Sequence, residues 1–318
     1  MSKYDAIVIG AGHNGLTNAA YLAKSGLKVL VVEKNDYIGG ASVSRVLHEG
    51  WTYSNCSYVC SLLRPEIFRD LNLQKYGLQV LPYGGSVTFM QNGDIFGGYS
   101  DDDLARREIG RFSKRDADAY VRFARDVSRQ CRFIKPMLLR TPPDPTSFKP
   151  KDLGELIYLF KRLYSLGEQT IYDTIRFYTM SVAEYLDEYF ESDVIKAALS
   201  GSGIIGTGLG PYSPGTAYVL LHHYMGEVDG SIGSWGFARG GMGSIANALA
   251  DAFKDYDGEL LTDAEVSQII VKRGRAKGVV LSNGDEYYAK NIVSNLDVKR
   301  TYQKLFDPKD LSEKVLKQ

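Results

Sequence analysis

The sequence predicts an α/β fold, and three features of its N-terminal stretch carry the prediction. A short apolar run, Ala6 to Ile9, has the composition of a strand buried on both faces of a parallel sheet. It leads into the turn Gly10-Ala11-Gly12-His13-Asn14-Gly15, after which apolar positions recur at helical spacing. A second apolar run, Val29 to Val32, ends on Glu33. Strand, glycine turn, helix, strand and acid, in this order, indicate a Rossmann-like dinucleotide-binding unit.

Each glycine of the turn has a separate physical role. Gly10 permits the tight turn, Gly12 lets backbone approach a pyrophosphate, and Gly15 lets helix and strand pack closely. The helix start offers unpaired N–H groups and a positive dipole end to phosphate oxygens. Glu33 lies 23 positions after Gly10, where we expect it to accept hydrogen bonds from the adenosine ribose. An ordinary glycine-rich turn in an α/β protein would leave this acid unexplained.

The residues that follow Glu33 bear on which dinucleotide is bound. Lys34 comes next, and then the segment Ile38-Gly39-Gly40-Ala41-Ser42. Here the sequence resembles the flavoproteins of the amine oxidase and phytoene-desaturase-like families, whose fingerprint continues past the acid as a basic residue and a Gly-Gly turn. The resemblance implies FAD as the cofactor, with Glu33 on the adenosine ribose. It places these further positions along the phosphates and the flavin-side ribitol: Lys34, Gly39, Gly40, Ala41 and Ser42.

A second glycine segment, Arg239-Gly240-Gly241-Met242-Gly243, extends the resemblance. In the desaturase-like flavoproteins such a segment returns the chain to the FAD domain beside the isoalloxazine ring. The resemblance therefore implies that Gly240, Gly241 and Gly243 lie near the flavin, and that Val266 contacts the adenine through its backbone. The stretches VIGAGHNGL, IGGAS, SLLRPEI, YVLLHH and RGGMG carry the resemblance along the chain.

The remaining pattern predicts a discontinuous domain organisation. Residues 1–77 and 236–300 are expected to form the FAD-binding domain. Residues 78–235 are expected to form a substrate-side domain of antiparallel strands, with a helical insertion over 100–200. Residues 301–318 begin a further segment. Because members of the resembled family continue well beyond this point, we expect the C-terminal part that completes the flavin site to be missing.

Turn and cap residues predict where several elements begin. Asn92-Gly93 and Asn283-Gly284 are two-residue hairpin signals between short strands. Ser113 with Asp116, and Ser181 with Glu184, predict helix starts. Two further starts are predicted at Ser100, before a run of aspartates, and at Ser213, before a proline. Residues 43–75 are interpreted as the link out of the nucleotide site, where Ser54 is either a polar neighbour of the cofactor or a turn cap.

Composition excludes several other classes of protein. Lys plus Arg and Asp plus Glu are both 38, so no overall field attracts nucleic acid or an anionic membrane. No apolar run approaches the roughly 18 residues of a membrane span. A first strand beginning by Tyr4 leaves no room for a secretory signal. The odd set Cys56, Cys60 and Cys131 suits a reducing compartment, and we interpret these thiols as buried and inert.

Together these features predict an FAD-dependent oxidoreductase that takes a hydride from an apolar small molecule. Two alternatives stay open: an amine-oxidase-type flavoenzyme, and a flavin-binding mitochondrial regulatory protein without turnover. The resemblance implies an intracellular protein of the mitochondrial matrix with a possible protein partner there, and the cytoplasm is the alternative. No residue stands out as an acid–base catalyst, and no metal site is predicted.

Overall fold

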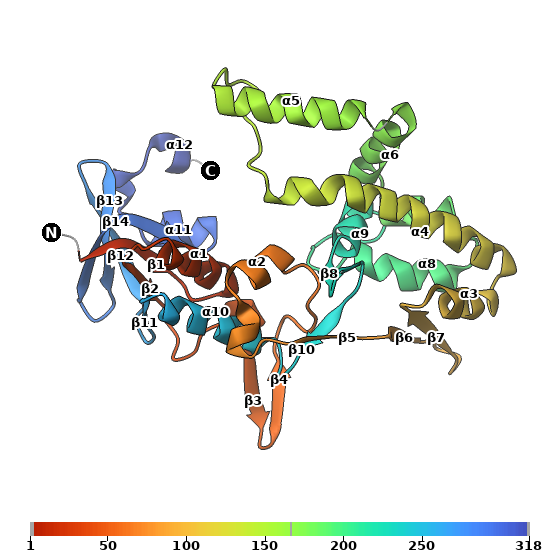
Figure 1. Ribbon diagram of the computed structural model, residues 1–318, viewed down its shortest axis with the longest axis horizontal. Coiled ribbons are helices and arrows are strands. Elements are labelled where there is room, and N and C mark those ends of the chain that lie inside the picture. The colour runs from red at the N-terminus through yellow and green to blue at the C-terminus, as the bar shows by residue number, and fades with distance from the viewer. Residues whose placement is uncertain (1–2, 166, 317–318) are drawn as a thin grey trace. The chain divides into compact units, whose positions relative to one another are not determined.

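The computed structural model describes residues 3–165 and 167–316, which divide into two compact units (Figure 1). Unit 1 comprises Met1–Leu81 and Gly236–Gln318, and unit 2 comprises Pro82–Trp235. Among the described residues, no helix is both long and apolar enough to cross a bilayer.

Unit 1 is built on a six-stranded sheet with the order β11-β2-β1-β14-β13-β12. The strands are β1 (Tyr4–Ile9), β2 (Val29–Val32), β11 (Glu259–Leu261), β12 (Val266–Lys272), β13 (Arg275–Leu281) and β14 (Glu286–Ser294). β11, β2, β1 and the second half of β14 run parallel, with Ala6 opposite Val29 and Asn291. The first half of β14 pairs antiparallel with β13, as the hairpin signal at Asn283-Gly284 predicts. One strand thus joins the parallel sheet to an antiparallel extension.

The two faces of the parallel strands are covered differently. Ala6, Val8, Val29 and Val31 pack on one face with α1 (His13–Lys24) and α10 (Gly243–Asp255), which lie side by side (Figure 1). Ile7, Ile9, Leu30 and Val32 pack on the other face against residues of β12 and β13. Because the side chains on both faces of β1 and β2 are buried, both strands appear in the sequence as continuous apolar runs. Burying each such side chain contributes roughly 1.5–3 kcal/mol.

Unit 1 also contains short elements outside the six-stranded sheet. They are η1 (Gly40–Ser42), β3 (Ser44–His48), β4 (Trp51–Ser54), α2 (Pro65–Asp70), η2 (Leu73–Tyr76), β5 (Val80–Pro82), β10 (Gly236–Ala238), α11 (Val298–Lys304), η5 (Pro308–Asp310) and α12 (Glu313–Leu316). The β3–β4 hairpin was not predicted, because residues 43–75 were interpreted only as a link. The hairpin is exposed over most of its length, so it lacks the clean alternation that marks a half-buried strand.

Unit 2 combines an antiparallel hairpin with a helical body. The hairpin pairs β6 (Gly85–Phe89) with β7 (Ile95–Tyr99), which confirms the turn predicted at Asn92-Gly93. The helical body consists of α3 (Asp102–Gly110), α4 (Lys114–Ile134), η3 (Lys135–Leu139), α5 (Pro150–Tyr164), α6 (Glu168–Thr179), α7 (Val182–Asp187), α8 (Asp193–Ser200), η4 (Gly201–Gly203) and α9 (Thr216–Tyr224). A small ribbon of β8 (Glu227–Val228) and β9 (Ser231–Ile232) follows. Phe123 lies at the centre of its core, with the rings of Tyr189 and Phe190 packed edge-on against it.

The predicted helix starts are partly confirmed. Ser113 caps α4, and Ser181 with Glu184 forms a complete capping box on α7. The start predicted at Ser100 is wrong by one residue, because Asp101 accepts from the Leu104 N–H and Ser100 instead donates to the Tyr83 carbonyl. The start predicted at Ser213 is also wrong. α9 begins at Thr216, since Gly215 has a φ of 86° that a right-handed helix excludes.

Asp116 generates a stability prediction for unit 2. Its carboxylate is fully buried and accepts from the backbone N–H groups of Glu191 and Ser192, each at 2.9 Å. Asp116→Ala would remove the buried acceptor of two part-buried N–H groups, so we expect a loss of about 1–3 kcal/mol in the free energy of unfolding. Urea denaturation followed by circular dichroism measures this loss. Asp118→Ala, on a side chain that is 82% exposed, is the matched control and should shift stability by less than about 0.5 kcal/mol. Equal effects of the two variants would contradict the assignment.

Candidate functional site

Three strands of unit 1 end together at one edge of the sheet. The Gly10 N–H donates to the Val32 carbonyl at 2.8 Å, and the Asn295 N–H donates to the Ile9 carbonyl at 2.9 Å. The residues just after β1, β2 and β14 therefore lie side by side. In open α/β sheets the crevice outside such carboxyl ends is where ligands bind.

The first glycine turn leaves no room for side chains. Gly10 has a φ of 96°, and a Cβ on Gly15 would lie 2.2 Å from the Gly10 carbonyl oxygen. Gly12 precedes α1, and none of the described side chains caps this helix start. Burial lowers the pKa of the neighbouring His13, so the imidazole stays neutral at the helix start. The first turn of α1 has no side-chain cap among the described residues, so its start can offer N–H groups to an anion.

A second glycine turn packs directly on the first. The Gly39 N–H donates to the Ala11 carbonyl at 2.9 Å. Gly39 and Gly40 have φ values of 115° and 55°, and a Cβ on Gly40 would lie 3.2 Å from the Gly12 Cα. Two turns that are far apart in the sequence therefore form one surface of bare backbone.

The carboxylate of Glu33 is buried beside these turns. Oε2 accepts from the Ala11 N–H at 2.8 Å, while Oε1 accepts from the Asn35 N–H at 3.0 Å and from the Asn35 side-chain amide at 2.9 Å. A carboxylate offers about four acceptor positions, so Oε2 keeps capacity for a hydroxyl donor. Sequence reasoning missed Asn35. Its signal is an amide two residues after the acid, a spacing that permits a local side-chain bond to the backbone.

Asn295 is a second residue that sequence reasoning did not assign to the site. Its side-chain Nδ2 lies 3.0 Å from the position that a Cβ would take on Gly12, and equally far from that on Gly15. The amide thus lies against the first glycine turn from the neighbouring strand. A polar residue immediately after a buried parallel strand was the available signal.

Three of the predicted site residues contribute less directly to the site. Ser42 is buried and its hydroxyl donates to the Gly39 carbonyl at 2.8 Å, so it stabilises the second glycine turn from within. Ala41, in the same short helix, is exposed. Lys34 follows Glu33 directly and is exposed as well.

The glycines of the return segment form the start of α10. Ser44 Oγ accepts from the Gly243 N–H at 2.9 Å, and Ser54 Oγ accepts from the Met242 N–H at 3.0 Å. A Cβ on Gly241 would lie 2.4 Å from Ser44 Oγ, so the close packing requires glycine there. Ser54 therefore caps the start of α10, a distant segment, and its position as a neighbour of the cofactor stays a prediction. Ser44 is a further cap that the sequence pattern did not reveal.

A cavity of about 650 Å³ in unit 1 lies beside α10 and the residues that flank the second glycine turn. Gly240 and Gly243 line it together with Ile38 and Val43, which flank the second glycine turn. Its other lining residues come mainly from α10 and from the strand ends, among them Ser244, Asn247, Leu260 and Thr262. Of the predicted site residues, Gly240 and Gly243 line this cavity, and the glycines of the two N-terminal turns are not among its lining residues.

Val266 lies further from the glycine turns. It is the first residue of β12, pairs with Leu281, and has its side chain in the apolar core. The segment before it reaches the site, since the Ala264 N–H donates to the Glu33 carbonyl at 2.8 Å. Val266 is thus two residues from a direct contact with Glu33.

The cysteines differ from one another in exposure. Cys60 and Cys131 are buried, and burial raises their thiol pKa values to about 11 and about 12. Both therefore stay protonated near neutral pH, which agrees with inert thiols. Cys56 is exposed, so the expectation that it is buried is wrong. It lies just after the β3–β4 hairpin, whose exposed strands the sequence pattern did not reveal.

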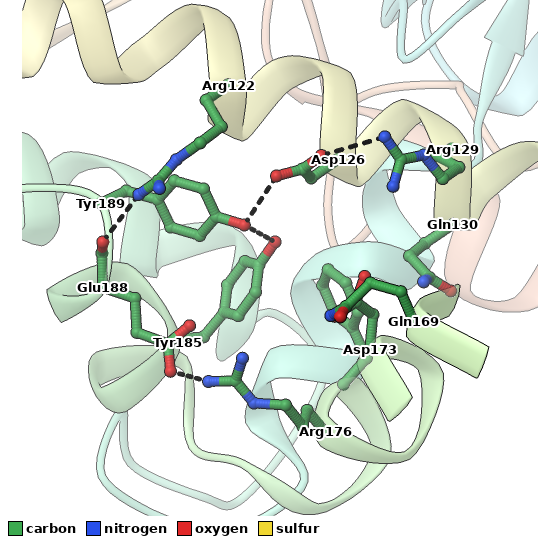
Figure 2. A pocket seen from close by; sticks show the side chains of 11 residues that line it. Arg122, Asp126, Arg129, Gln130, Gln169, Asp173, Arg176, Tyr185, Glu188 and Tyr189 are labelled. Atoms are coloured by element: carbon green, nitrogen blue, oxygen red, sulfur yellow. Dashed lines mark hydrogen bonds and ion pairs between the residues drawn. The ribbon is translucent and has the colours of Figure 1, made fainter. Parts of the chain in front are cut away.

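Unit 2 has a pocket of its own, of about 330 Å³, between α4, α6 and α7 (Figure 2). Its charged side chains largely bind one another: Arg129 pairs with Asp126, and Arg176 pairs with Glu188. Tyr185 donates to the Tyr189 hydroxyl and Tyr189 donates to Asp126, both at 3.2 Å (Figure 2). Burial raises the pKa of both phenols, so they remain hydrogen-bond donors. This internal pairing leaves little unmatched charge to select a ligand.

The site in unit 1 has the chemistry that a diphosphate ester of two nucleosides requires. Bare backbone at two glycine turns permits close approach, and the uncapped start of α1 supplies donors for phosphate oxygens. The Glu33 carboxylate can accept from a sugar hydroxyl. The residues present therefore fit a dinucleotide cofactor.

Comparisons with known proteins point to one family. Residues 15–318 match the family described as flavin containing amine oxidoreductase. The mouse pyridine nucleotide-disulfide oxidoreductase domain-containing protein 2 is 35% identical over 323 residues, covering 95% of this chain and 55% of that protein. Phytoene desaturase (neurosporene-forming) of Rhodobacter capsulatus is 28% identical, covering 96% of this chain and 55% of that protein. The chain thus spans about half the length of the curated relatives that it matches.

Solved structures share the fold at low sequence identity. An oxidoreductase from Methanosarcina mazei superposes with a TM-score of 0.57 at 17% identity, covering 98% of this chain and 64% of that chain. A putrescine oxidase variant superposes with a TM-score of 0.57 at 17% identity, covering 98% of this chain and 62% of that chain. With the family match over nearly the whole chain, we conclude that this protein belongs to the flavin-containing amine oxidoreductase family.

Proposed function

We propose that the chain binds FAD at the paired glycine turns of unit 1 and serves an oxidoreductase that takes a hydride from an apolar substrate. The observation that carries the proposal is the contact between the two turns, made by Gly39 on Ala11 beside the buried Glu33 carboxylate. One glycine turn suits any dinucleotide. The second turn, packed on the first, favours FAD, because the flavoproteins that the sequence resembles carry a Gly-Gly turn after the acid.

The proposal gives each predicted residue a part in holding the cofactor. Gly10, Gly12 and Gly15, with the start of α1, would hold the pyrophosphate, and Glu33 would accept from the adenosine ribose. Around these, the proposal assigns Lys34, Gly39, Gly40, Ala41 and Ser42 to the phosphate and ribitol side, Gly240, Gly241 and Gly243 to the flavin side, and the backbone of Val266 to the adenine. Residues 1–77 and 236–300 would then be the FAD-binding domain, and residues 78–235 the part that selects the substrate.

FAD, when bound, supplies the hydride acceptor, and the protein contributes binding, orientation and insulation from water. Ser44 and Ser54 fix the return segment at the start of α10, so that its glycines present bare backbone to the cavity. Ile38 and Val43 would supply apolar parts of the wall of the same space. We assign no residue of this chain as an acid–base catalyst.

The names of two relatives support an apolar substrate, whereas the family description names amines. Among proteins similar along the chain are a phytoene desaturase and the prolycopene isomerase of Daucus carota, the latter 29% identical over 97% of this chain. The putrescine oxidase likeness rests on fold alone. From the motif resemblance we also propose a mitochondrial matrix location, which import of the labelled chain into isolated mitochondria would test.

Flavin retention tests the cofactor site. After incubation with FAD and desalting, the wild-type chain should keep the absorbance bands of oxidised flavin. Gly12→Ala should weaken FAD binding by about tenfold or more, because its methyl group would occupy the backbone surface meant for phosphate. The added Cβ meets only the flexible end of Asn295 at 3.0 Å and the backbone of Gly40 at 4.0 Å, so folding should survive.

The matched control for that variant is Gly154→Ala, which adds the same methyl group in α5 where nothing lies within 4 Å. It should bind FAD like the wild type. A wild-type chain that stays colourless would contradict FAD binding by these residues, and equal binding by both glycine variants would contradict the assigned position of the pyrophosphate.

Anaerobic reduction tests the reaction class. The flavin-loaded protein should be mixed with a conjugated polyene in the absence of oxygen. The absorbance of oxidised flavin at about 450 nm should then fall, because hydride transfer reduces the flavin. A panel of primary amines should leave the absorbance unchanged. Bleaching by amines alone would favour the amine-oxidase alternative. Bleaching by neither class would favour a flavin-binding protein without turnover.

A further inference from the structure

Asn295 lies against the first glycine turn of unit 1. It follows β14 directly, and its main-chain N–H donates to the Ile9 carbonyl at the end of β1. Its side-chain Nδ2 lies 3.0 Å from the position that a Cβ would take on Gly12 or on Gly15. The same atom lies 3.8 Å from the corresponding position on Gly10. One amide therefore occupies the space that three absent side chains leave.

The side-chain amide of Asn295 is not used by the protein itself. Neither its nitrogen nor its oxygen forms a hydrogen bond within the part of the chain that the structure describes. In the same part of the chain, the fully buried side-chain atoms without a partner belong to Arg64 and Glu66. Asn295 is half-buried, so its unpartnered amide keeps access to solvent. Water or a ligand then completes its hydrogen bonds.

The first turn has few other donors to offer. The Gly10 N–H donates to a carbonyl of β2, and the Ala11 N–H donates to the Glu33 carboxylate, each at 2.8 Å. The start of α1 supplies the remaining backbone donors. Apart from its chain neighbours, the one described side-chain atom within 4 Å of the Cβ position on Gly12 is Asn295 Nδ2. A group bound against Gly12 would therefore meet the amide at hydrogen-bonding distance.

We propose that Asn295 binds the diphosphate of the cofactor, with Nδ2 donating to a phosphate oxygen that lies against Gly12. An amide suits this position because it donates without adding charge, whereas a carboxylate would repel the diphosphate. The start of α1 would supply further donors to the same group. The inference rests on the proposed function, since it requires a dinucleotide at this turn, and it adds a binding residue from a third strand.

Flavin titration of the 318-residue chain tests this contact. The change in flavin fluorescence at increasing protein concentration gives the dissociation constant for FAD. Asn295→Ala removes the donor and should raise this constant about tenfold, the usual effect of losing a hydrogen bond to a charged group. The matched control is Asn291→Ala in β14, which removes the same amide where it donates to the Asp5 carbonyl at 3.2 Å. The control should bind FAD like the wild type.

Asn295→Asp distinguishes a donor from a packing group. The new side chain has nearly the same size, but its carboxylate repels phosphate, so the dissociation constant at about pH 8 should rise by about thirtyfold or more. The phosphate raises the pKa of this new carboxyl in the complex, so binding takes up a proton and strengthens as the pH falls. At about pH 5 the protonated carboxyl donates again, and the affinity should approach that of the wild type. Comparison with the wild type at each pH removes the contributions of His13 and Glu33, which both proteins share.

The outcomes separate this contact from the cofactor site as a whole. If the wild type binds FAD and Asn295→Ala binds it equally well, the inference is wrong and the proposed function stands. An equal loss from Asn295→Ala and Asn291→Ala would also overturn the inference. So would an Asn295→Asp variant whose affinity stays low at pH 5, because the residue would then act by packing alone. A wild-type chain that binds no FAD contradicts the proposed function, and the inference falls with it.

Discussion

The buried carboxylate of Glu33 is the interaction on which the architecture of the site depends. Its two oxygens hold the first glycine turn through Ala11 and the following loop through Asn35. Its backbone pairs with Leu261 of β11 and with Ala264 before β12. One residue thus joins the strand ends that border the crevice. Because a buried carboxylate needs such partners to offset its desolvation, the turn and the acid constrain each other.

Around Glu33, the surface of unit 1 consists of backbone with few side chains. Glycines occupy the places where a Cβ would strike another chain segment, as at Gly15 and Gly241. The start of α1 has no side-chain cap among the described residues, whereas serines cap the start of α10. The two helix starts therefore differ in chemistry. The first can accept an external anion, and the second is held in position by the protein itself, which suits a rigid wall of a cofactor cavity.

Unit 2 distributes its polarity differently. Its pocket is lined by arginines and carboxylates that bind each other, so charge is matched inside the unit (Figure 2). On α5, the Glu155–Arg140 ion pair and the packing of Leu163 against the core hold the inner side, while Phe160 and Tyr164 are exposed.

The sequence by itself determined the βαβ unit, the acid at the end of β2, the two hairpin turns and the capping box of Ser181, because each depends on neighbours within a few residues. Only the tertiary structure decided that Gly39 packs on Ala11, that Asn295 lies against Gly12, and that Ser44 and Ser54 cap α10. These contacts join residues up to about 280 positions apart, and no local pattern encodes such a pairing.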